Sequence, residues 1–227
     1  MVIYLDSAFS ADIAEVGSMV SGFTTNPSLL RKAGVENYEA WARETCKLVG
    51  DKPISFEVIA DDFDAMSAQA HVINIWGPNV YVKIPITNTM GESSFKVIRK
   101  LSKAGIKVNV TAITTKEQVK EAVKALDKRT KSIISVFAGR IADTGVDPKS
   151  TMKYAVRVAK RKGIEVLWAS PRQVLDVVTA DKLGVHIITV GRDILAKLHI
   201  IGKDLTQYSR ETVQQFYDDA TKSGYEI

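Results

Sequence analysis

Short apolar runs alternate with helix-like segments eight times along the chain, and this repeat limits the possible folds more than any other feature. The runs are rich in valine, isoleucine, tyrosine, phenylalanine and threonine, the residues that favour strands. Three of the helix-like segments end at Gly105, Gly163 and Gly184, and glycine is a common C-terminal signal of helices. The eight predicted strands cover residues 2–7, 22–26, 54–59, 80–86, 107–113, 132–139, 165–170 and 185–190.

Eight strands that alternate with eight helices predict a (β/α)8 TIM barrel. The length of 227 residues lies within the range of roughly 200 to 400 residues for that architecture. Nearly continuous apolar strands are typical of a parallel sheet covered by helices. An open doubly wound sheet is the alternative, but it calls for a glycine-rich phosphate turn after an early strand, which the sequence lacks. We expect one barrel domain over residues 1–227, with residues 205–222 as a C-terminal helical extension.

Composition excludes several classes of protein. Hydrophobic residues make up 45% and charged residues 25%, which is typical of a soluble globular chain. Cys46 is the only cysteine, so intrachain disulfides and cysteine-pair metal sites are excluded. His71, His186 and His199 show no ligand spacing, and we expect no metal and no cofactor. Neither a signal peptide nor an apolar run of about 20 residues is evident, so we expect a cytoplasmic protein that does not bind membranes.

The charge pattern favours a solvated surface over a nucleic-acid interface. The net charge is +5, from 31 basic and 26 acidic residues. Lys153, Arg157, Lys160 and Arg161 share one face of a predicted helix. No aromatic residues lie between these charges to stack on bases, so we expect no nucleic acid partner, although a basic-surface binder stays an alternative.

A lysine inside a strand is the first chemical signal. Lys83 lies in the apolar run VYVKIPI, residues 80–86. An unpaired ammonium is costly to bury. Lys83 therefore either extends to water at the strand end, or it loses its proton and becomes a nucleophile toward carbonyl groups.

Polar side chains also occur late in every predicted strand. In a barrel of this kind, catalytic residues come from the C-terminal ends of several strands. Four pairs of these residues are spaced by two, which places both members of a pair on one face of a strand. The candidates are Asp6, Thr24, Asn26, Glu57, Lys83, Asn109, Thr111, Ser135, Phe137, Ser170 and Thr189, with Arg140 and Arg172 just beyond the strand ends.

These residue types suit Schiff-base aldol chemistry. The amine of Lys83 attacks a ketone and forms an imine, which serves as an electron sink. A carboxylate then removes a proton from a hydroxyl group two carbons away, and the carbon–carbon bond breaks. Asp6 and Glu57 are the two candidates for this acid–base work. Asp6 has a second interpretation as the cap of the first helix, a role that Ser7 or Ser10 could also fill.

Arg140, Ser170 and Arg172 are candidates for an anion site. In the segment WASPR, Ser170 is predicted to cap a helix that begins at Pro171, so that free backbone amides face an anion. The alternative is that the arginines form ion pairs inside the protein. Their candidate partners are Asp143 and Asp176.

Seven segments resemble the transaldolase family, in particular its small-subunit branch, which also holds the fructose-6-phosphate aldolases. They occur in the family's order over nearly the whole chain, and TTNPSLL together with VKIP and GRI is highly specific. The matching segments are LDSA (5–8), GFTTNPSLL (22–30), FEV (56–58), VKIPIT (82–87), GIKVNVTAI (105–113), FAGRIADTG (137–145) and WASPR (168–172).

The resemblance implies a role for most of the candidates. Lys83 corresponds to the Schiff-base lysine, Asp6 to the proton-transfer aspartate, and Glu57 to a glutamate that works through a water held with Thr111. Sugar contacts are implied at Asn26, Asn109, Ser135 and Ser170, and phosphate contacts at Arg140 and Arg172. The resemblance also implies sugar phosphate substrates and a homo-oligomer, either a pentamer or a decamer, in which the C-terminal helix reaches a neighbouring subunit.

Glu57 and Phe137 distinguish the two branches of the family. In the aldolase branch, glutamine commonly takes the first position and tyrosine the second. The tyrosine is thought to help free dihydroxyacetone leave. The residues found here therefore favour transfer of a dihydroxyacetone unit to an aldehyde over simple cleavage. A lyase, and a sugar phosphate binding protein without turnover, stay open as alternatives.

Five positions depart from the family pattern and leave the natural substrate open. Arg192 either contacts a second anionic group or is solvated. A ketose with another anionic group, or a sugar from a specialised pathway, is therefore an alternative to the standard sugar phosphates. The departures are Thr114, Thr115, Val136, Gly191 and Arg192.

Overall fold

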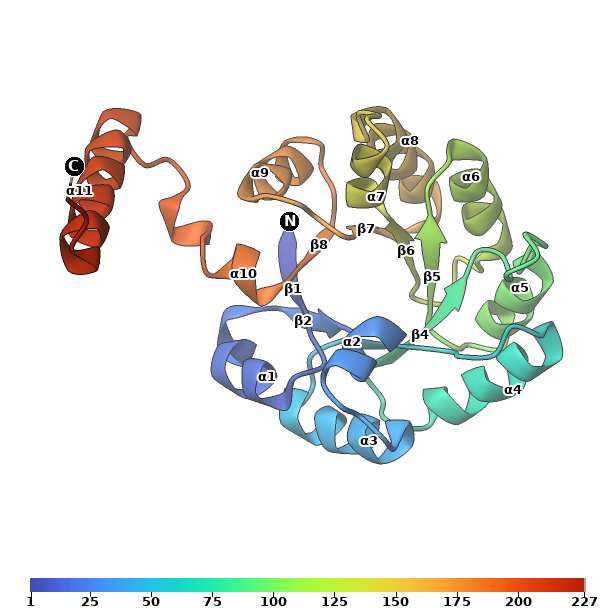
Figure 1. Ribbon diagram of the computed structural model, residues 1–227. Helices are drawn as coiled ribbons and strands as arrows, with labels where there is room; N and C mark the ends of the chain where they lie inside the picture. The colour runs from blue at the N-terminus through green and yellow to red at the C-terminus, as the bar shows by residue number, and fades with distance from the viewer. Residues whose placement is uncertain (227) are drawn as a thin grey trace. The chain divides into compact units, whose positions relative to one another are not determined.

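Eight parallel strands close into a barrel in chain order, which confirms the predicted (β/α)8 fold (Figure 1). The computed structural model describes residues 1–226. The last strand pairs with the first, with Tyr4 opposite Thr189, and this pairing closes the ring. The strands are β1 (Val2–Asp6), β2 (Gly22–Thr24), β3 (Ile54–Glu57), β4 (Val80–Pro85), β5 (Val108–Ile113), β6 (Ile133–Val136), β7 (Glu165–Trp168) and β8 (Ile187–Val190).

Helices follow each strand and cover the outside of the barrel (Figure 1). Two short helices, α2 and α7, directly follow β2 and β6 and precede the longer helix of the same unit. The helices are α1 (Ser10–Val16), α2 (Pro27–Lys32), α3 (Tyr38–Val49), α4 (Phe63–Asn74), α5 (Phe95–Lys103), α6 (Lys116–Ala125), α7 (Ala138–Asp143), α8 (Lys149–Ala159), α9 (Val174–Lys182), α10 (Arg192–Leu195) and α11 (Leu205–Ser223).

Glycine ends three of these units as the sequence predicts. Gly105, Gly163 and Gly184 have φ angles of 86°, 67° and 73°. In this left-handed region a Cβ atom clashes with the backbone, so glycine is favoured where a helix stops and the chain turns toward the next strand.

Several strands are shorter than predicted. β2 ends at Thr24 because Asn26 already caps α2, its Oδ1 accepting from the backbone N–H of Leu29 at 3.0 Å. β6 ends at Val136 because Phe137 is the N-cap of α7. The residues that follow these strands thus lie on loops and helix starts at the C-terminal end of the barrel, where side chains are free to face a substrate.

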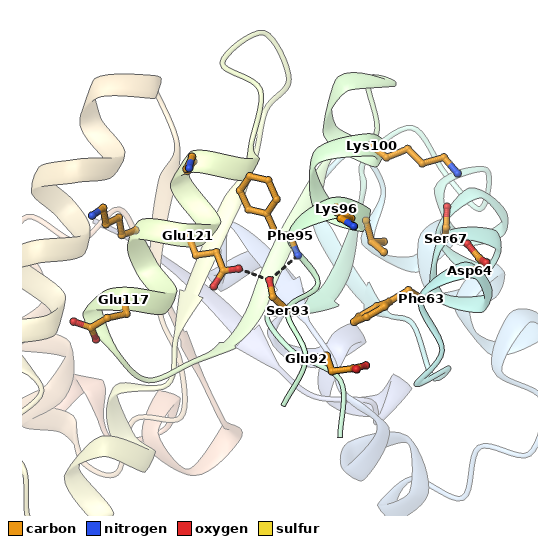
Figure 2. Close-up of a pocket in the computed structure, with 13 residues that line it drawn as sticks. Phe63, Asp64, Ser67, Glu92, Ser93, Phe95, Lys96, Lys100, Glu117 and Glu121 are labelled. Carbon is orange, nitrogen blue, oxygen red and sulfur yellow. Dashed lines mark hydrogen bonds between the residues drawn. The ribbon is translucent and has the colours of Figure 1, made fainter. Parts of the chain in front are cut away.

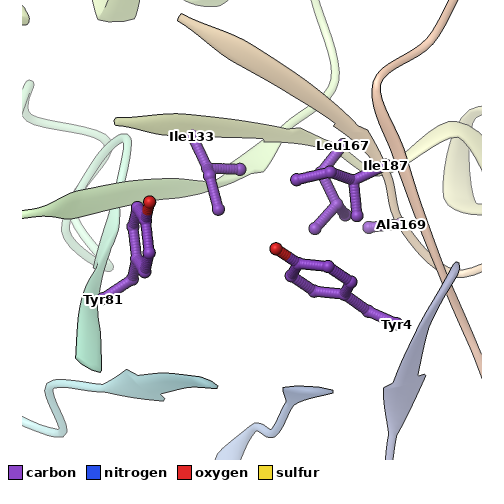
Figure 3. Close-up of a cluster of buried hydrophobic side chains, with 6 residues drawn as sticks. All are labelled: Tyr4, Tyr81, Ile133, Leu167, Ala169 and Ile187. Atoms are coloured by element: carbon purple, nitrogen blue, oxygen red, sulfur yellow. The ribbon is translucent and has the colours of Figure 1, made fainter. Parts of the chain in front are cut away.

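Apolar side chains fill the inside of the barrel (Figure 3). Tyr4 and Tyr81 are 4% and 5% exposed, and they pack with residues from three other strands. Gly22 makes room for Tyr4, because a Cβ at this position would lie 2.6 Å from the tyrosine ring. The remaining members of this group, here called the barrel floor, are Ile133, Leu167, Ala169 and Ile187.

The chain forms two compact units, Met1–Leu195 and the residues from Ala196 onward. The second unit contains α11, which confirms the predicted extra helix. Asp204 caps α11, and Gly224 follows it with a φ of 64°. Whether the chain behaves as a single barrel domain with an extension stays a prediction. Of the helices described, none is both long and apolar enough to cross a membrane.

Candidate active site

A cavity of about 460 Å³ lies at the C-terminal ends of the strands. Twelve of the thirteen candidate residues predicted from the sequence line it, although they come from all eight strands and the segments that follow them. Asn109 is the exception and lies just beneath. The predicted residues that line the cavity are Asp6, Thr24, Asn26, Glu57, Lys83, Thr111, Ser135, Phe137, Arg140, Ser170, Arg172 and Thr189.

Lys83 is buried in β4 and does not extend to water, with an exposed fraction of 5%. Its Nζ donates a hydrogen bond to the backbone carbonyl of Thr25 at 2.7 Å. It also lies 3.0 Å from Oε2 of Glu57, a carboxylate that is itself largely buried. Removing one partner from such a pair leaves an uncompensated buried charge, so Lys83 and Glu57 depend on each other.

Asp6 ends β1 and receives a hydrogen bond of 2.7 Å from the hydroxyl of Thr24. The Thr24 hydroxyl also lies 2.5 Å from that of Thr189. Thr24 has one hydroxyl proton, so the geometry orders the chain as Thr189 to Thr24 to Asp6.

Burial raises the pKa of Asp6 above its ordinary value of 3.8, and the Glu57 charge raises it further. The Lys83 charge and the Thr24 hydrogen bond lower the pKa of Asp6, but the net shift is upward. A carboxylate with a raised pKa accepts a proton more readily, as a general base requires.

Asp6 is not the cap of the first helix. The N-cap of α1 is Phe9, which makes no side-chain capping bond. Ser7 bonds locally instead, since its hydroxyl donates to Asp12 at 2.9 Å and accepts from the Phe9 N–H at 3.1 Å. Asp6 therefore faces the cavity.

A buried polar chain supports Ser135. The Ser135 hydroxyl donates to Oδ1 of Asn109 at 2.7 Å, and Nδ2 of Asn109 donates to the Ser55 hydroxyl at 3.1 Å. Asn109 is fully buried. In this structure it therefore orients Ser135, and the expected direct sugar contact of Asn109 stays a prediction. The Thr111 hydroxyl is also buried, and it makes no hydrogen bond within residues 1–226.

The two predicted phosphate arginines differ in their surroundings. Arg172 pairs with Asp143, with Nε 2.9 Å from Oδ1 and a second contact from Nη2 to Oδ2. The alternative of an internal ion pair is thus confirmed for Arg172, and this pairing lowers the pKa of Asp143. Arg140 instead lies over the Phe137 ring, 5.8 Å from its centroid. Ion pairs exposed to solvent contribute little to stability, so the pair with Asp143 competes only weakly with a bound anion for Arg172.

The predicted helix start at Ser170 and Pro171 is wrong. Ser170 has a left-handed φ of 57°, and α9 begins at Val174 with Gln173 as its N-cap. The carboxylate of Asp176 accepts hydrogen bonds from the backbone N–H groups of Arg172 at 2.6 Å and Gln173 at 3.2 Å. Asp176 thus occupies the amides that the prediction assigned to an anion.

Arg192 does not line the cavity. Its guanidinium pairs with Glu15 of α1. Arg192 is predicted from the sequence either to contact an anionic group of the substrate or to be solvated, and the ion pair with Glu15 is neither of these.

Several other residues that line the cavity were not predicted. Ser28 and Lys32 of α2 line the cavity, and their spacing of four residues on one helix face is a signal that could have identified them. Ala112 lines it as well, with a left-handed φ of 60° at a bulge where the β5–β6 register shifts between Val110 and Ile113. Such a backbone costs an alanine roughly 1 kcal/mol or more, and bulges often occur next to active sites.

A larger hollow of about 1030 Å³ lies on the outer surface against α4, α5 and α6 (Figure 2). We refer to it as the outer groove. In it the Ser93 hydroxyl donates to Glu121 and accepts from the N–H of Phe95 at 3.0 Å. The groove is lined by Phe63, Asp64, Ser67, Glu92, Ser93, Phe95, Lys96, Val97, Lys100, Glu117, Lys120, Glu121 and Lys124.

Over residues 1–226, no three His, Cys, Asp or Glu side chains come together in a way that could hold a metal ion.

Comparison with known proteins gives a consistent result. A family model described as "Transaldolase/Fructose-6-phosphate aldolase" matches residues 3–227. A protein named "Probable transaldolase" from Methanococcus maripaludis is 39% identical over 202 residues, which cover 87% of this chain and 89% of the relative. A protein of the same name from a Thermoanaerobacter species is 34% identical over 231 residues and covers both chains fully.

Solved structures agree on the fold alone. KGPDC from Streptococcus mutans superimposes with a TM-score of 0.56 at 15% sequence identity, over 85% of this chain and 88% of that one. At this identity the likeness extends to the barrel and not to the chemistry.

Proposed function

The chain belongs to the transaldolase/fructose-6-phosphate aldolase family, and on that premise we propose that it is a transaldolase working through an imine on Lys83. It transfers a dihydroxyacetone unit from a ketose phosphate, of the fructose 6-phosphate or sedoheptulose 7-phosphate type, to an aldehyde such as erythrose 4-phosphate or glyceraldehyde 3-phosphate. The single observation that carries the proposal is the buried Lys83 amine 3.0 Å from Glu57, in one cavity with Asp6.

The proposed reaction begins with imine formation. The Lys83 amine adds to the C2 carbonyl of the donor, and the resulting hydroxyl leaves as water after it receives a proton. Glu57 lies beside Nζ, and the buried Thr111 hydroxyl has a free hydrogen-bonding capacity. Glu57, through a water held with Thr111, is the proposed route for the protons of this step.

Cleavage then depends on Asp6. Its carboxylate takes the proton of the C4 hydroxyl, the C3–C4 bond breaks, and the electron pair moves into the imine to give an enamine. The aldehyde part of the donor leaves. An acceptor aldehyde takes its place, the enamine attacks it with return of the proton from Asp6, and hydrolysis releases the new ketose.

Phe137 favours transfer in this proposal because it brings no acidic hydroxyl to the enamine. Arg140 and Arg172, at the rim of the same cavity, are the proposed contacts of the donor phosphate. Asn26, Ser135 and Ser170 are the proposed contacts of sugar hydroxyls. A cytoplasmic location, a role in the pentose phosphate pathway and a pentameric or decameric assembly complete the proposal.

Borohydride trapping tests the central step. The protein is incubated with fructose 6-phosphate and borohydride, and the site of modification is mapped by mass spectrometry. We expect a reduced three-carbon adduct on Lys83, absent in Lys83→Met and retained in Lys120→Met, which changes a lysine of the outer groove. If no ketose from a panel that includes differently charged sugars leaves an adduct on the folded protein, the proposal is wrong.

Release of free dihydroxyacetone distinguishes transferase from lyase. In the absence of an acceptor aldehyde, the wild type is expected to release little, whereas Phe137→Tyr is expected to release more. Rapid release by the wild type, without dependence on acceptor, would instead support the fructose-6-phosphate aldolase type of reaction.

A further inference from the structure

The pairing of β2 with β3 stops just where the site begins. The Phe23 N–H donates to the Pro53 carbonyl at 2.8 Å, and the Thr25 N–H donates to the Ser55 carbonyl at 3.3 Å. In a regular parallel ladder the next bond would join the Glu57 N–H to the Thr25 carbonyl. The one after it would join the N–H of residue 27 to the Glu57 carbonyl.

Both positions at Glu57 are taken by the Tyr38 hydroxyl. The Glu57 N–H donates to Oη of Tyr38 at 2.9 Å, and Oη donates to the Glu57 carbonyl at 3.0 Å. Residue 27 is a proline and has no N–H to offer. The Thr25 carbonyl accepts from Nζ of Lys83 at 2.7 Å instead. The Tyr38 side chain thus replaces two hydrogen bonds of the β2–β3 ladder. The Thr25 carbonyl is left to accept a hydrogen bond from Lys83.

We propose that Tyr38 is a positioning residue for the imine-forming lysine. The Tyr38 hydroxyl satisfies the backbone N–H and carbonyl of Glu57, so the Thr25 carbonyl is left to bind the Lys83 amine. The same two hydrogen bonds fix the end of β3, which carries the Glu57 side chain. This inference rests on the proposed function, because it assigns Tyr38 to the chemistry of Lys83. Two of the four tetrahedral directions of Nζ are then fixed by Thr25 and Glu57 and one by Cε, which leaves one for the attacking lone pair.

Tyr38 is itself held rigidly. It is the first residue of α3, whose N-cap Asn37 accepts from the Ala40 N–H at 2.9 Å. Its ring packs edge-on against Phe56 and Trp76, with centroid distances of 6.3 and 5.2 Å. Burial raises the pKa of Tyr38, so its hydroxyl keeps the proton that it donates to the Glu57 carbonyl.

Tyr38→Phe tests the proposal because it removes only the hydroxyl and keeps the ring in its aromatic surroundings. We expect kcat for transfer, and the rate at which borohydride traps the Lys83 imine at saturating fructose 6-phosphate, to fall by about ten- to hundredfold. The KM for the donor should change by less than about threefold, since the arginines at the rim are untouched. Tyr4→Phe is the matched control, because it removes a buried hydroxyl of the barrel floor, and it should keep wild-type kinetics.

A crystal structure of Tyr38→Phe provides a readout that does not depend on activity. We expect the Glu57 N–H to turn to the Thr25 carbonyl, and Nζ of Lys83 to move out of hydrogen-bond distance of that carbonyl. Lys83 still bonded to Thr25, or a variant with wild-type trapping rates, would overturn the inference while the proposed function stands. A wild type that forms no imine with any ketose overturns the proposed function instead, and the variant structure still decides whether Tyr38 directs the Thr25 carbonyl to Lys83.

Discussion

The cavity at the barrel mouth and the outer groove differ in how far their charged side chains are buried. The groove has more than twice the volume, and it carries four acidic and four lysine side chains. All of these except the partly buried Glu121 are exposed (Figure 2). The mouth holds fewer charges, but Lys83 and Glu57 there are largely withdrawn from water on the ends of strands. In water an ion pair is worth little, and in a buried site the same pair is strong and costly to break.

Volume is therefore a poor guide to chemistry in this molecule. Most charges of the groove lie on helices where solvent screens them, whereas Lys83 and Glu57 of the mouth lie on strands of a closed sheet whose backbone hydrogen bonds keep them in place. The comparison predicts that equivalent substitutions in the two hollows differ in effect by orders of magnitude.

The largest difference is expected for lysines. Lys83→Met removes the nucleophile and should lower kcat/KM for transfer by about 10⁴-fold or more. Lys120→Met in the outer groove should leave kcat/KM within about twofold. Steady-state kinetics with a coupled assay of the released aldehyde measures both. Residual activity of Lys83→Met near the wild-type level would mean that the buried lysine is structural.

Asp6→Asn is expected to affect activity and stability in opposite directions. Loss of the base should lower kcat by about 10²- to 10⁴-fold. The folded state raises the pKa of Asp6 above 3.8, so stability falls as the pH rises from 3.8 to the raised value, and the whole cost of ionising Asp6 is present above it. The neutral amide avoids this cost, and the variant should melt at a higher temperature at pH 7, by about 2–4 °C for each kcal/mol regained.

The stability gain of Asp6→Asn has its own pH test. Below the ordinary pKa of 3.8 both the aspartic acid and the asparagine are neutral, so the two melting temperatures should converge. Thermal denaturation across the acid range measures the difference. A gain that persists unchanged in acid would show that the charge of Asp6 is not its cause.

Substitutions of the two arginines at the rim should have the next largest effect on kinetics. Arg140→Ala should raise KM for a phosphorylated donor by about ten- to hundredfold, since charged hydrogen bonds are worth roughly 1.5–3 kcal/mol. Arg172→Ala should have a smaller effect, because its guanidinium already shares hydrogen bonds with Asp143. Asp143→Asn removes the charged partner of Arg172 and should therefore lower KM for the phosphorylated donor. Donors without a phosphate should be insensitive to all three changes.

The pH profile should respond to a change in one hydroxyl. The hydrogen bond from Thr24 lowers the pKa of Asp6, so Thr24→Val should raise that pKa. Activity that needs the carboxylate is lost as pH falls through this pKa, and the acidic limb of kcat/KM should therefore move to higher pH. Thr189→Val, which leaves the Thr24–Asp6 bond in place, should shift the limb less.

The smallest effect is expected in the groove. Glu121→Gln keeps a hydrogen-bond acceptor for Ser93 and removes only a charge near solvent. It should change the free energy of unfolding by about 0.5 kcal/mol or less and leave kinetics unchanged. Chemical denaturation measures the free energy of unfolding. A loss of activity would indicate that the outer groove contributes to function despite its exposed charges.

Local patterns were enough to predict the barrel and most of the mouth. The alternation of apolar runs indicated eight strands, and the position of Lys83 and Glu57 late in their strands predicted that they would meet. The start of α9 was missed because it depends on a contact between Asp176 and the backbone of residues 172 and 173. The bulge at Ala112 was missed because nothing in an alanine signals a positive φ.

Pairings between distant segments were the least accessible. The Tyr38 hydroxyl reaches Glu57 across nineteen positions of sequence. No sequence motif around Tyr38 indicates this contact. The partner of Arg172 was left open between two aspartates, and only the fold decides that Asp143 binds the guanidinium while Asp176 binds the backbone.

The position of the cavity determines how molecules enter and leave this protein. Tyr4, Tyr81 and their neighbours fill part of the barrel interior (Figure 3), and the cavity lies at the C-terminal ends of the strands, so reactants and products share that side of the barrel. In the proposed reaction, the first aldehyde has to leave before the second enters. Double-reciprocal plots at fixed acceptor concentrations should then be parallel, and the departing aldehyde should compete with the arriving one for the enamine form of the enzyme.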